Sequence, residues 1–311
     1  MSVQQVTQPS TPASGGGRLE QRKRLLQRLH VNNSIALAIL WIITVIVAVL
    51  FIAIILHLLI DGAPVLFSTG FYGTGNAGIA PELFNTFYIL ILSELFLVPI
   101  SLAAAIYLVE YAPRGWLVTA IHFAAETLAG VPSIVLGLFG FLAFAVYGGA
   151  GISRLAGALT LLCLNFPLGL RLFEDALSSV PRELREGGLA LGATKWRVIR
   201  NVVLPSALPG LVTGTILTAG RIIGEAAALL FTMGTFNPAN VFTLNPFLAS
   251  DTLTTRLYYI KGLGAGSTGL SANQETALAA GISAVLVLLL LVLNLAARGL
   301  GRLIQRRVTA A

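Results

Sequence analysis

Six stretches of this sequence are each long and apolar enough to cross a lipid bilayer, which takes about 20 consecutive residues in a helix. They lie near residues 35–60, 86–108, 116–147, 155–170, 207–233 and 277–297. Of the 311 residues, 56% are apolar and 11% are charged. A soluble domain carries about 25% charged residues, so this composition excludes a soluble enzyme or a nucleic-acid-binding protein. The sequence predicts an all-α, polytopic membrane protein with about six transmembrane helices.

The third of these stretches contains a short segment that should interrupt a helix. Residues 116–147 are broken by Gly130-Val131-Pro132-Ser133. Proline removes a backbone donor and its ring clashes with the preceding turn, so we expect a helix break at Gly130 and Pro132. Two arrangements are compatible with this break. The stretch forms either one tilted, kinked helix or two shorter segments joined by a re-entrant bend.

Lysine and arginine are concentrated on one side of the predicted spans. With six spans, sixteen of them fall on the side of both termini, and three fall on the opposite side. Because basic residues mark cytoplasmic loops, we expect both termini in the cytoplasm. The three on the opposite side are Arg154, Arg256 and Lys261. The expected organisation is a disordered basic tail at 1–34, a transmembrane domain at 35–297 and a basic tail at 298–311.

A cytoplasmic segment at about 181–205 has the pattern of two short helices. Pro181 suits the first turn of a helix, Gly192 suits the left-handed position that ends one, and Thr194 can cap the next. The second helix is expected to end near Pro205, since its apolar residues recur at helical spacing up to that point. Two interpretations stay open at this stage. The pair either lies on lipid headgroups or is a docking element for a cytoplasmic partner.

Two charged residues lie inside the fifth apolar stretch. Arg221 is near its middle, where an arginine costs about 2.5–3.5 kcal/mol on insertion scales, so it should face a wet cavity or a partner. Glu225 is four residues on, about one helical turn away, and can form an ion pair with it. One interpretation is a pair that only fixes helix packing. The other is a site on a substrate path, where Arg221 binds an anion and the negative charge of Glu225 weakens that binding so that the anion can be released.

No pattern for a bound cofactor or metal is found in the sequence. The glycine-rich residues 262–269 lack the Gly-Lys-Ser/Thr ending of a phosphate loop, so we expect any ATP to bind to another chain. His, Cys and carboxylate residues show no ligand spacing. Glu94 is interpreted as a packing or lipid-edge residue rather than a relay carboxylate, and His122 as an interface or packing residue rather than a ligand or switch. For Glu126, one turn before the break, packing and a position in a cavity are equally compatible with the sequence.

The segment 181–205 resembles the EAA loop of ABC-transporter permeases. That pattern is Glu-Ala-Ala, a glycine four residues after the second alanine, and a stretch ending in Ile-x-Leu-Pro. The matching positions are Glu186, Gly192 with the adjacent Ala193, and Leu204-Pro205. Glycines 187 and 188 replace both alanines and Val202 replaces the isoleucine. Each glycine costs a helix about 1 kcal/mol relative to alanine, so we expect a weaker first helix until a partner orders it.

The run from Gly220 to Glu225 is similar to a signature of PstA-type phosphate permeases, within the MetI-like permease superfamily. Three other stretches, at 108–113, 129–140 and 176–183, look like the same family. This resemblance implies that Arg171 and Arg221 are the basic residues along a phosphate path. For Arg171, an ordinary positive-inside anchor is the alternative. Within the signature Ile222, Ala226 and Ala228 stand where the family has Ala, Thr and Pro.

The resemblance implies a permease subunit of an ATP-driven phosphate importer in the bacterial cytoplasmic membrane. Its implied partners are a PstC-type permease, a PstB-type ATPase dimer and a PstS-type phosphate-binding protein, besides membrane lipid, and no nucleic acid. The EAA loop would take the ATP-driven movement from the ATPase, and this chain itself would be no enzyme. The alternatives are a permease of the same superfamily for another oxyanion or solute, and a secondary anion transporter.

Overall fold

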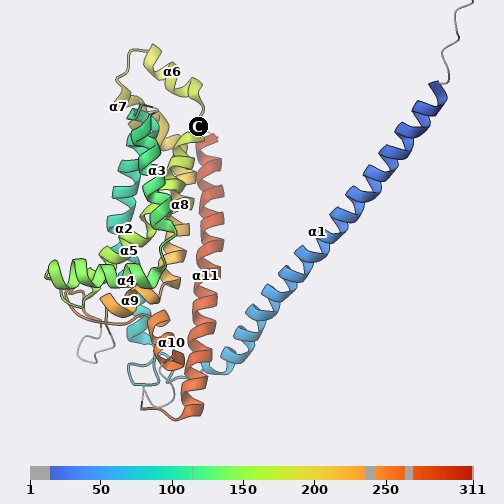
Figure 1. Cartoon of the computed structure of the whole chain (residues 1–311). Coiled ribbons are helices and arrows are strands. Elements are labelled where there is room, and N and C mark those ends of the chain that lie inside the picture. Colours follow the sequence, from blue (N-terminus) through green and yellow to red (C-terminus); the bar gives the residue numbers. More distant parts are fainter. Residues whose placement is uncertain (1–14, 114, 235–241, 263–268, 310–311) are drawn as a thin grey trace, which may run out of the picture. The chain divides into compact units, whose positions relative to one another are not determined.

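The computed structural model describes residues 15–113, 115–234, 242–262 and 269–309, and every regular element within them is a helix. Figure 1 shows the elements, of which η1, η2 and η3 are π-helical turns. They are α1 (Gly15–Leu66), α2 (Ala80–Ile106), η1 (Tyr107–Tyr111), α3 (Trp116–Ala129), α4 (Ser133–Gly140), η2 (Phe141–Tyr147), α5 (Arg154–Ser178), α6 (Arg182–Ala190), α7 (Lys195–Val198), η3 (Ile199–Val203), α8 (Leu204–Gly224), α9 (Ala227–Thr232), α10 (Leu253–Gly262) and α11 (Ala272–Thr309). The expected all-α fold is confirmed.

Five helical segments of the described chain are long and apolar enough to cross a membrane, and a sixth is broken. The continuous ones are Asn33–Leu66, Ala80–Tyr111, Arg154–Ser178, Lys195–Gly224 and Ala272–Gly299. The sixth joins α3 to the α4–η2 helix through a bend of 101°. Gly130 caps α3 and Pro132 stands just before α4, so the break lies where the sequence predicts it. Of the two expected arrangements, the structure has two segments joined by a sharp bend.

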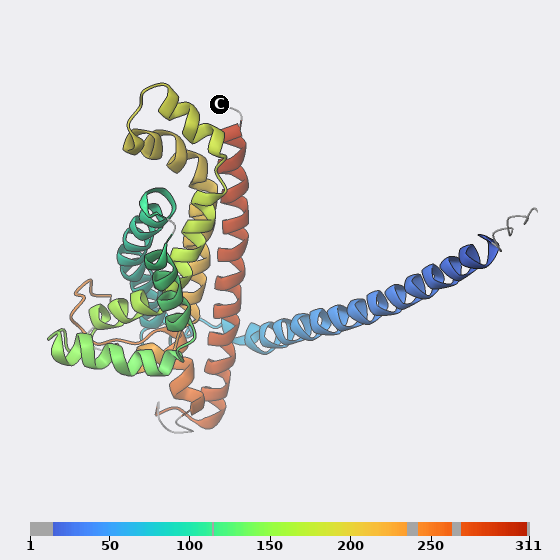
Figure 2. The same cartoon turned by 45° about the horizontal axis from the view of Figure 1, so that its top comes forward.

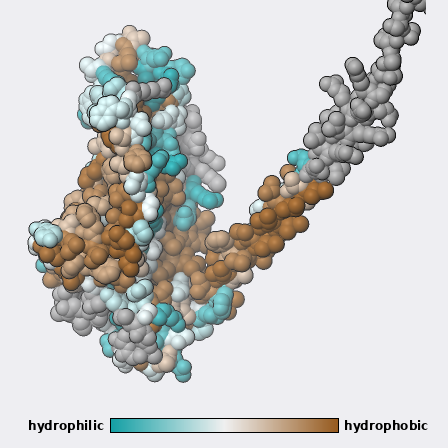
Figure 3. Space-filling view, in the orientation of Figure 1, coloured by the Kyte–Doolittle hydropathy of each residue, from teal (hydrophilic) through white to brown (hydrophobic). Residues whose placement is uncertain are grey.

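Helices α2, α5 and α8 pack together around the buried core, and α11 packs along α8 (Figure 1, Figure 2). α5 is the most buried of the spanning segments. The segment after the bend is held by close backbone contact, because a methyl group at Gly137 of α4 would lie 2.7 Å from Cα of Ala228 in α9. Apolar residues cover the middle of the bundle and hydrophilic residues gather at its two ends (Figure 3), as a membrane-embedded bundle requires.

The two predicted tails are largely helical where the structure describes them. α1 begins at Gly15, inside the segment 1–34 that the sequence predicts to be disordered, and residues 1–14 lie outside the described residues. α11 likewise runs through the expected tail at 298–311 as far as Thr309. Both segments are rich in Leu and Arg, which are good helix formers, so the spanning helices continue beyond the apolar run.

The end of the bundle that carries residues 67–79, residues 242–252 and α10 is called the loop end here; α6 lies at the opposite end (Figure 1). Arg154, one of the three basic residues on the side opposite the predicted cytoplasmic one, is fully buried at the loop end. Its guanidinium donates to Oδ1 of Asn85 at 2.8 Å, to Oγ of Ser250 at 2.8 Å and to the carbonyl of Thr243. It also lies 4.9 Å from the centre of the Tyr88 ring. Arg154 therefore fixes the loop over residues 243–250 to α2.

A second buried cluster at the loop end holds two carboxylates and one guanidinium. Glu82 and Asp251 are each 1% exposed, and Nε of Arg256 lies 3.6 Å from Oε1 of Glu82. Burial and, to a lesser degree, the Glu82 carboxylate raise the pKa of Asp251 to about 8, against the opposing effect of Arg256. Because one guanidinium faces two buried carboxylates, the cluster favours a protonated Asp251.

Stability of the loop end should therefore fall as the pH rises. A carboxyl whose folded-state pKa lies above its ordinary value of 3.8 contributes fully below that value, and this contribution is lost as the pH rises through about 8. We expect the thermal unfolding midpoint of the purified protein to fall between pH 5 and pH 9. In Asp251→Asn the fall should be much smaller, whereas Glu183→Gln, at an exposed carboxylate, should retain it. Equal slopes in all three proteins would contradict this assignment.

Candidate functional site

The α6–α7 segment has the two-helix geometry that its sequence predicts, with one difference. Gly192 has a φ of +79°, the left-handed conformation that ends α6, and the Thr194 hydroxyl accepts from the backbone N–H of Arg197 at 3.4 Å to cap α7. Pro181 precedes α6 rather than lying in its first turn. Glu186 is exposed on α6, and the half-buried Ala193 packs against the core below it. The segment thus presents α6 at one end of the bundle (Figure 2).

The second helix does not end at Pro205, contrary to expectation. α7, η3 and α8 form one continuous helix from Lys195 to Gly224, and Leu204 and Pro205 are its first residues after the π-helical turn η3. A π-helical turn shifts the hydrogen-bond pattern by one residue, so a proline ring without an N–H is accommodated directly after it. The α6–α7 segment is therefore joined rigidly to a membrane-spanning helix.

Arg185 anchors α6 to the bundle, and sequence analysis missed it. Its guanidinium donates to the carbonyls of Leu177 at 2.7 Å and Val180 at 2.6 Å, and to Oε1 of Glu110 at 2.9 Å. Leu177 lies in the last turn of α5 and Val180 lies two residues after its end, where backbone acceptors lack helical partners. Glu110 lies 75 residues away in η1. Arg185 thus ties α6 to both α5 and the end of the second span.

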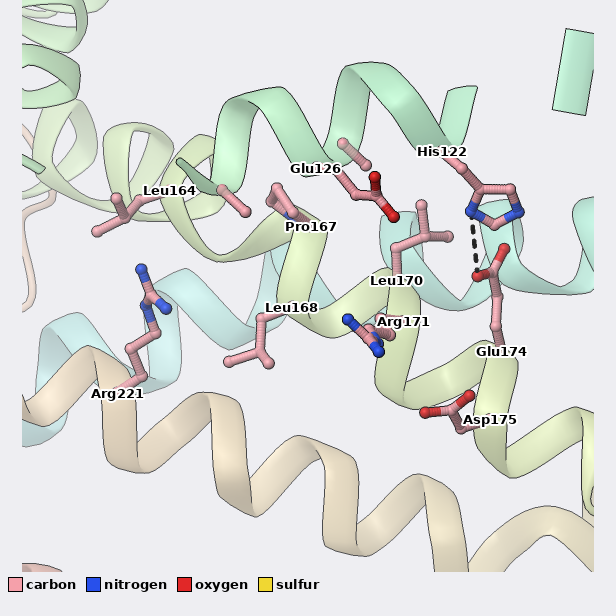
Figure 4. A pocket seen from close by; sticks show the side chains of 12 residues that line it. His122, Glu126, Leu164, Pro167, Leu168, Leu170, Arg171, Glu174, Asp175 and Arg221 are labelled. Atoms are coloured by element: carbon pink, nitrogen blue, oxygen red, sulfur yellow. Dashed lines mark ion pairs between the residues drawn. The ribbon is translucent and has the colours of Figure 1, made fainter. Parts of the chain in front are cut away.

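A cavity of about 380 Å³, called the arginine cavity here, lies between α3, α5 and α8 (Figure 4). It is lined by His122, Ala125, Glu126, Ala129, Leu164, Pro167, Leu168, Leu170, Arg171, Glu174, Asp175 and Arg221. The structure therefore brings Arg171 and Arg221 to one cavity, 50 residues apart in sequence. Glu126, which the sequence left open, lines it as well.

The two arginines of the cavity carry no ion pair and no hydrogen bond within the part of the chain that the structure describes. In the view of Figure 4, Arg221 lies toward Leu164 and Leu168, and Arg171 lies on the side of Asp175. Nδ1 of His122 lies 3.7 Å from Oε2 of Glu174 at the far side. Two available guanidinium groups can bind an anion, because each presents paired N–H donors that suit an oxyanion.

The expected ion pair between Arg221 and Glu225 is absent. α8 ends at Gly224, and Glu225 has extended backbone angles of −79° and 130°, so the two residues do not follow each other on one helix. Oε1 of Glu225 instead accepts from the backbone N–H of Ala228 at 3.2 Å, at the start of α9. Glu225 is not among the residues that line the arginine cavity. It is a helix-capping residue, and Arg221 is left available.

Glu94 is held inside the bundle by a neighbouring helix. The hydroxyl of the buried Thr218 in α8 donates to Oε1 of Glu94 in α2 at 2.7 Å. This contact agrees with the packing role inferred from the sequence. Within the described residues no group of three or more His, Cys, Asp or Glu side chains could hold a metal ion.

Over residues 97–310 the sequence matches the family described as the binding-protein-dependent transport system inner membrane component. The chain belongs to this family. Members of it are membrane permeases of ABC transporters, and the EAA-like α6–α7 segment and the arginine cavity both lie within the matched residues. The resemblance to PstA-type and MetI-like permeases is confirmed by the relatives below.

The chain is 37% identical to the probable ABC transporter permease protein YqgI of Bacillus subtilis, over 90% of this chain and 98% of that protein. It is 31% identical to the phosphate transport system permease protein PstA 1 of Mycobacterium tuberculosis, over 80% of this chain and 82% of that protein. Among solved structures, it resembles the inward-facing MetNI methionine ABC transporter, with a TM-score of 0.55, 23% identity, and coverage of 74% of this chain and 95% of that one. The MetI-like permease fold is thereby confirmed.

The two glycines that depart from the permease pattern occupy different surroundings in α6. A methyl group at Gly187 would meet nothing within 4 Å, whereas one at Gly188 would lie 2.9 Å from Cγ2 of Val198 in α7. Gly187 is therefore free to be replaced. Gly188 lets α6 approach α7 closely, so its absent side chain has a packing reason that the sequence alone does not reveal.

Gly187→Ala should strengthen α6 and Gly188→Ala should not. Alanine stabilises a helix interior by about 1 kcal/mol over glycine, which corresponds to roughly fivefold slower amide exchange in α6 when nothing else changes. At Gly188 the contact with Val198 offsets that gain. Hydrogen exchange of residues 182–190 in the purified permease measures the difference, with the wild type as reference. Equal protection in the two variants would mean that the packing of α6 on α7 is looser than the structure has it.

Proposed function

We propose that this ABC permease subunit conducts inorganic phosphate into the cell in an ATP-driven importer, and that its arginine cavity forms part of the route. Its fold class and family are those of a MetI-type permease. The specific cargo is supported by the PstA relatives and by the chemistry of the cavity. The single observation that carries the proposal is the pair of unpartnered guanidinium groups of Arg171 and Arg221.

An unpaired arginine within a membrane span is costly, so its presence calls for an explanation. Placing one at the centre of a helix costs about 2.5–3.5 kcal/mol on insertion scales. Arg154 offsets its burial with hydrogen bonds to side chains and carbonyls, but the Arg221 side chain makes no hydrogen bond within the described residues. A passing oxyanion would supply them, since phosphate oxygens accept two N–H groups from one guanidinium.

The carboxylates of the cavity favour release over tight binding. Glu126, Glu174 and Asp175 share the lining with the two arginines. Glu174 is paired with His122, while Asp175 is exposed near Arg171 (Figure 4). An anion bound at Arg221 therefore meets increasing negative charge as it moves past Arg171 toward α6. A transporter needs a site of moderate affinity, because a cargo held too strongly does not leave.

The remaining parts of the importer are other chains. We propose a PstC-type permease that completes the route, a PstB-type ATPase dimer that binds ATP and docks on α6, and a PstS-type protein that delivers phosphate to the loop end. Alternating access would follow when ATPase closure moves α6, since α6 is anchored to α5 and joined to α8. The excess of basic residues supports a cytoplasmic location for the α6 end and both termini.

Arg221→Gln should abolish ATP-driven phosphate uptake while the complex still assembles. Glutamine keeps a polar side chain of similar length but loses the charge that holds the anion. The measurement is uptake of labelled phosphate by proteoliposomes that contain the complete complex, with Arg200→Gln as the control because Arg200 is exposed on η3. Undiminished uptake in Arg221→Gln would assign Arg221 to packing. Uptake by the wild type without the ATPase would instead favour a secondary transporter.

Glu186→Lys should uncouple ATP hydrolysis from transport. Glu186 is exposed on α6, so reversing its charge alters the docking surface without disturbing the core. We expect uptake to fall at least several-fold while ATP hydrolysis by the complex continues. Glu183→Lys, in the first turn of the same helix, is the matched control. A fully coupled Glu186→Lys complex would count against docking at this residue.

Another oxyanion is the second candidate cargo, because the same two guanidinium groups suit any tetrahedral oxyanion. The PstA 1 relative named above for phosphate is 31% identical over 80% of this chain, whereas YqgI, 37% identical over 90% of it, is described only as a probable ABC transporter permease. Competition separates the two possibilities. Excess sulfate should leave phosphate uptake unchanged in a phosphate importer and should suppress it in a general oxyanion importer.

A further inference from the structure

A second cavity adjoins the arginine cavity at the α6 end of the bundle. This α6 cavity has a volume of about 580 Å³ and is lined by residues of the second span, α3, α5 and α6, among them Ser178 and Arg182. His122, Glu174 and Asp175 line both cavities. The two cavities therefore meet at these three side chains, and a solute that leaves the arginine cavity toward α6 has to pass them.

An ion pair between two helices lies at this junction. His122 belongs to α3 and Glu174 belongs to α5, and their side chains point toward each other with 3.7 Å between Nδ1 and Oε2 (Figure 4). The histidine side chain is 43% exposed and the glutamate side chain is 14% exposed. A pair with this much solvent contact is weak, since water screens the attraction. It is suited to repeated opening, unlike the buried contacts of Arg154.

α3 is the element most able to move at this junction. None of its residues is buried, and it ends at the sharp bend before α4, which separates it from the well-packed segment that follows. Its contacts in the described chain are chiefly with α5. A small displacement of α3 away from α5 therefore separates His122 from Glu174 without disrupting the core.

The contacts of Arg185, which anchor α6, lie close to the same ion pair. Arg185 of α6 donates to the carbonyl of Leu177, which lies three residues after Glu174 on α5. It also donates to Glu110, which lines the α6 cavity. A movement of α6 would therefore displace α5 within one helical turn of Glu174.

From these contacts we propose that the His122–Glu174 pair is the inner gate of the route: paired, it separates the two cavities, and it opens when movement of α6, passed to α5, separates α3 from α5. His122 and Glu174 act as positioning residues that hold the two helices together. The proposal rests on the proposed function for the identity of the cargo. Opening of the gate, however, is measured as access to the arginine cavity. It can therefore be tested without phosphate.

Thiol labelling measures this access directly. Cys163 is the one cysteine of the chain, so Cys163→Ala gives a background free of thiols. Leu168→Cys then reports on the arginine cavity, because Leu168 lines only that one of the two cavities. Ser178→Cys reports on the α6 cavity alone and is the control for reagent access. A membrane-impermeant thiol reagent is added on the ATPase side of the reconstituted full complex, with the ATPase held closed by a non-hydrolysable ATP analogue.

Breaking the pair should expose the arginine cavity. With His122→Gln or Glu174→Gln, we expect Leu168→Cys to be labelled about two- to fivefold faster, in keeping with the small energy of a partly exposed ion pair. Labelling of Ser178→Cys should not change. Asp175→Asn is the matched control, since Asp175 lines the same two cavities but makes no ion pair with His122. The exchanged pair, His122→Glu with Glu174→His, should restore slow labelling.

Two outcomes would overturn the gate. Unchanged labelling of Leu168→Cys in both single variants would show that the pair does not limit access. Equal acceleration by Asp175→Asn would show a general effect of charge instead. Failure of the proposed function gives a different result, because a complex that moves no phosphate would still show faster labelling when the pair is broken.

Discussion

The organisation of this permease depends on how its charged side chains are neutralised inside a membrane-spanning bundle. A guanidinium in an apolar region needs acceptors or water, and the chain meets this requirement in two ways. Arg154 is completely buried and is held by Asn85, Ser250 and the carbonyls of one loop, so it is part of the scaffold. Arg171 and Arg221 face a cavity and have no acceptor in the described chain. That difference separates structural cations from those available to a cargo.

Helix α5 connects the parts on which transport depends. It packs between α2 and α8 in the core, carries Arg171 and Glu174 in the arginine cavity, and ends at the carbonyls that Arg185 of α6 holds. A rigid helix transmits a displacement at one end to the side chains along it. The anchored α6 and the weakly packed α3 therefore both contact α5, as the proposed gate requires.

Several local features were predicted correctly because they follow from backbone chemistry. The break at Pro132, the left-handed Gly192 and the cap at Thr194 each depend on residues within one turn. The ion pair of Arg221 with Glu225 was wrong because the argument assumed a continuous helix, whereas α8 ends between them. Arg185 was missed because its acceptors are two backbone carbonyls and a carboxylate 75 residues away, which leave no pattern in the sequence.

The sequence by itself determined the class of protein, the approximate spans, the bend in the third one and the two-helix segment with its permease signature. Hydropathy, proline geometry and capping are properties of short stretches, and they act before distant parts of the chain meet. Only the tertiary structure decided which charges are neutralised and which line a cavity. The physical reason is that a side chain's partner depends on which helices pack together, and here α3, α5 and α8 bring together residues as far apart as His122 and Arg221.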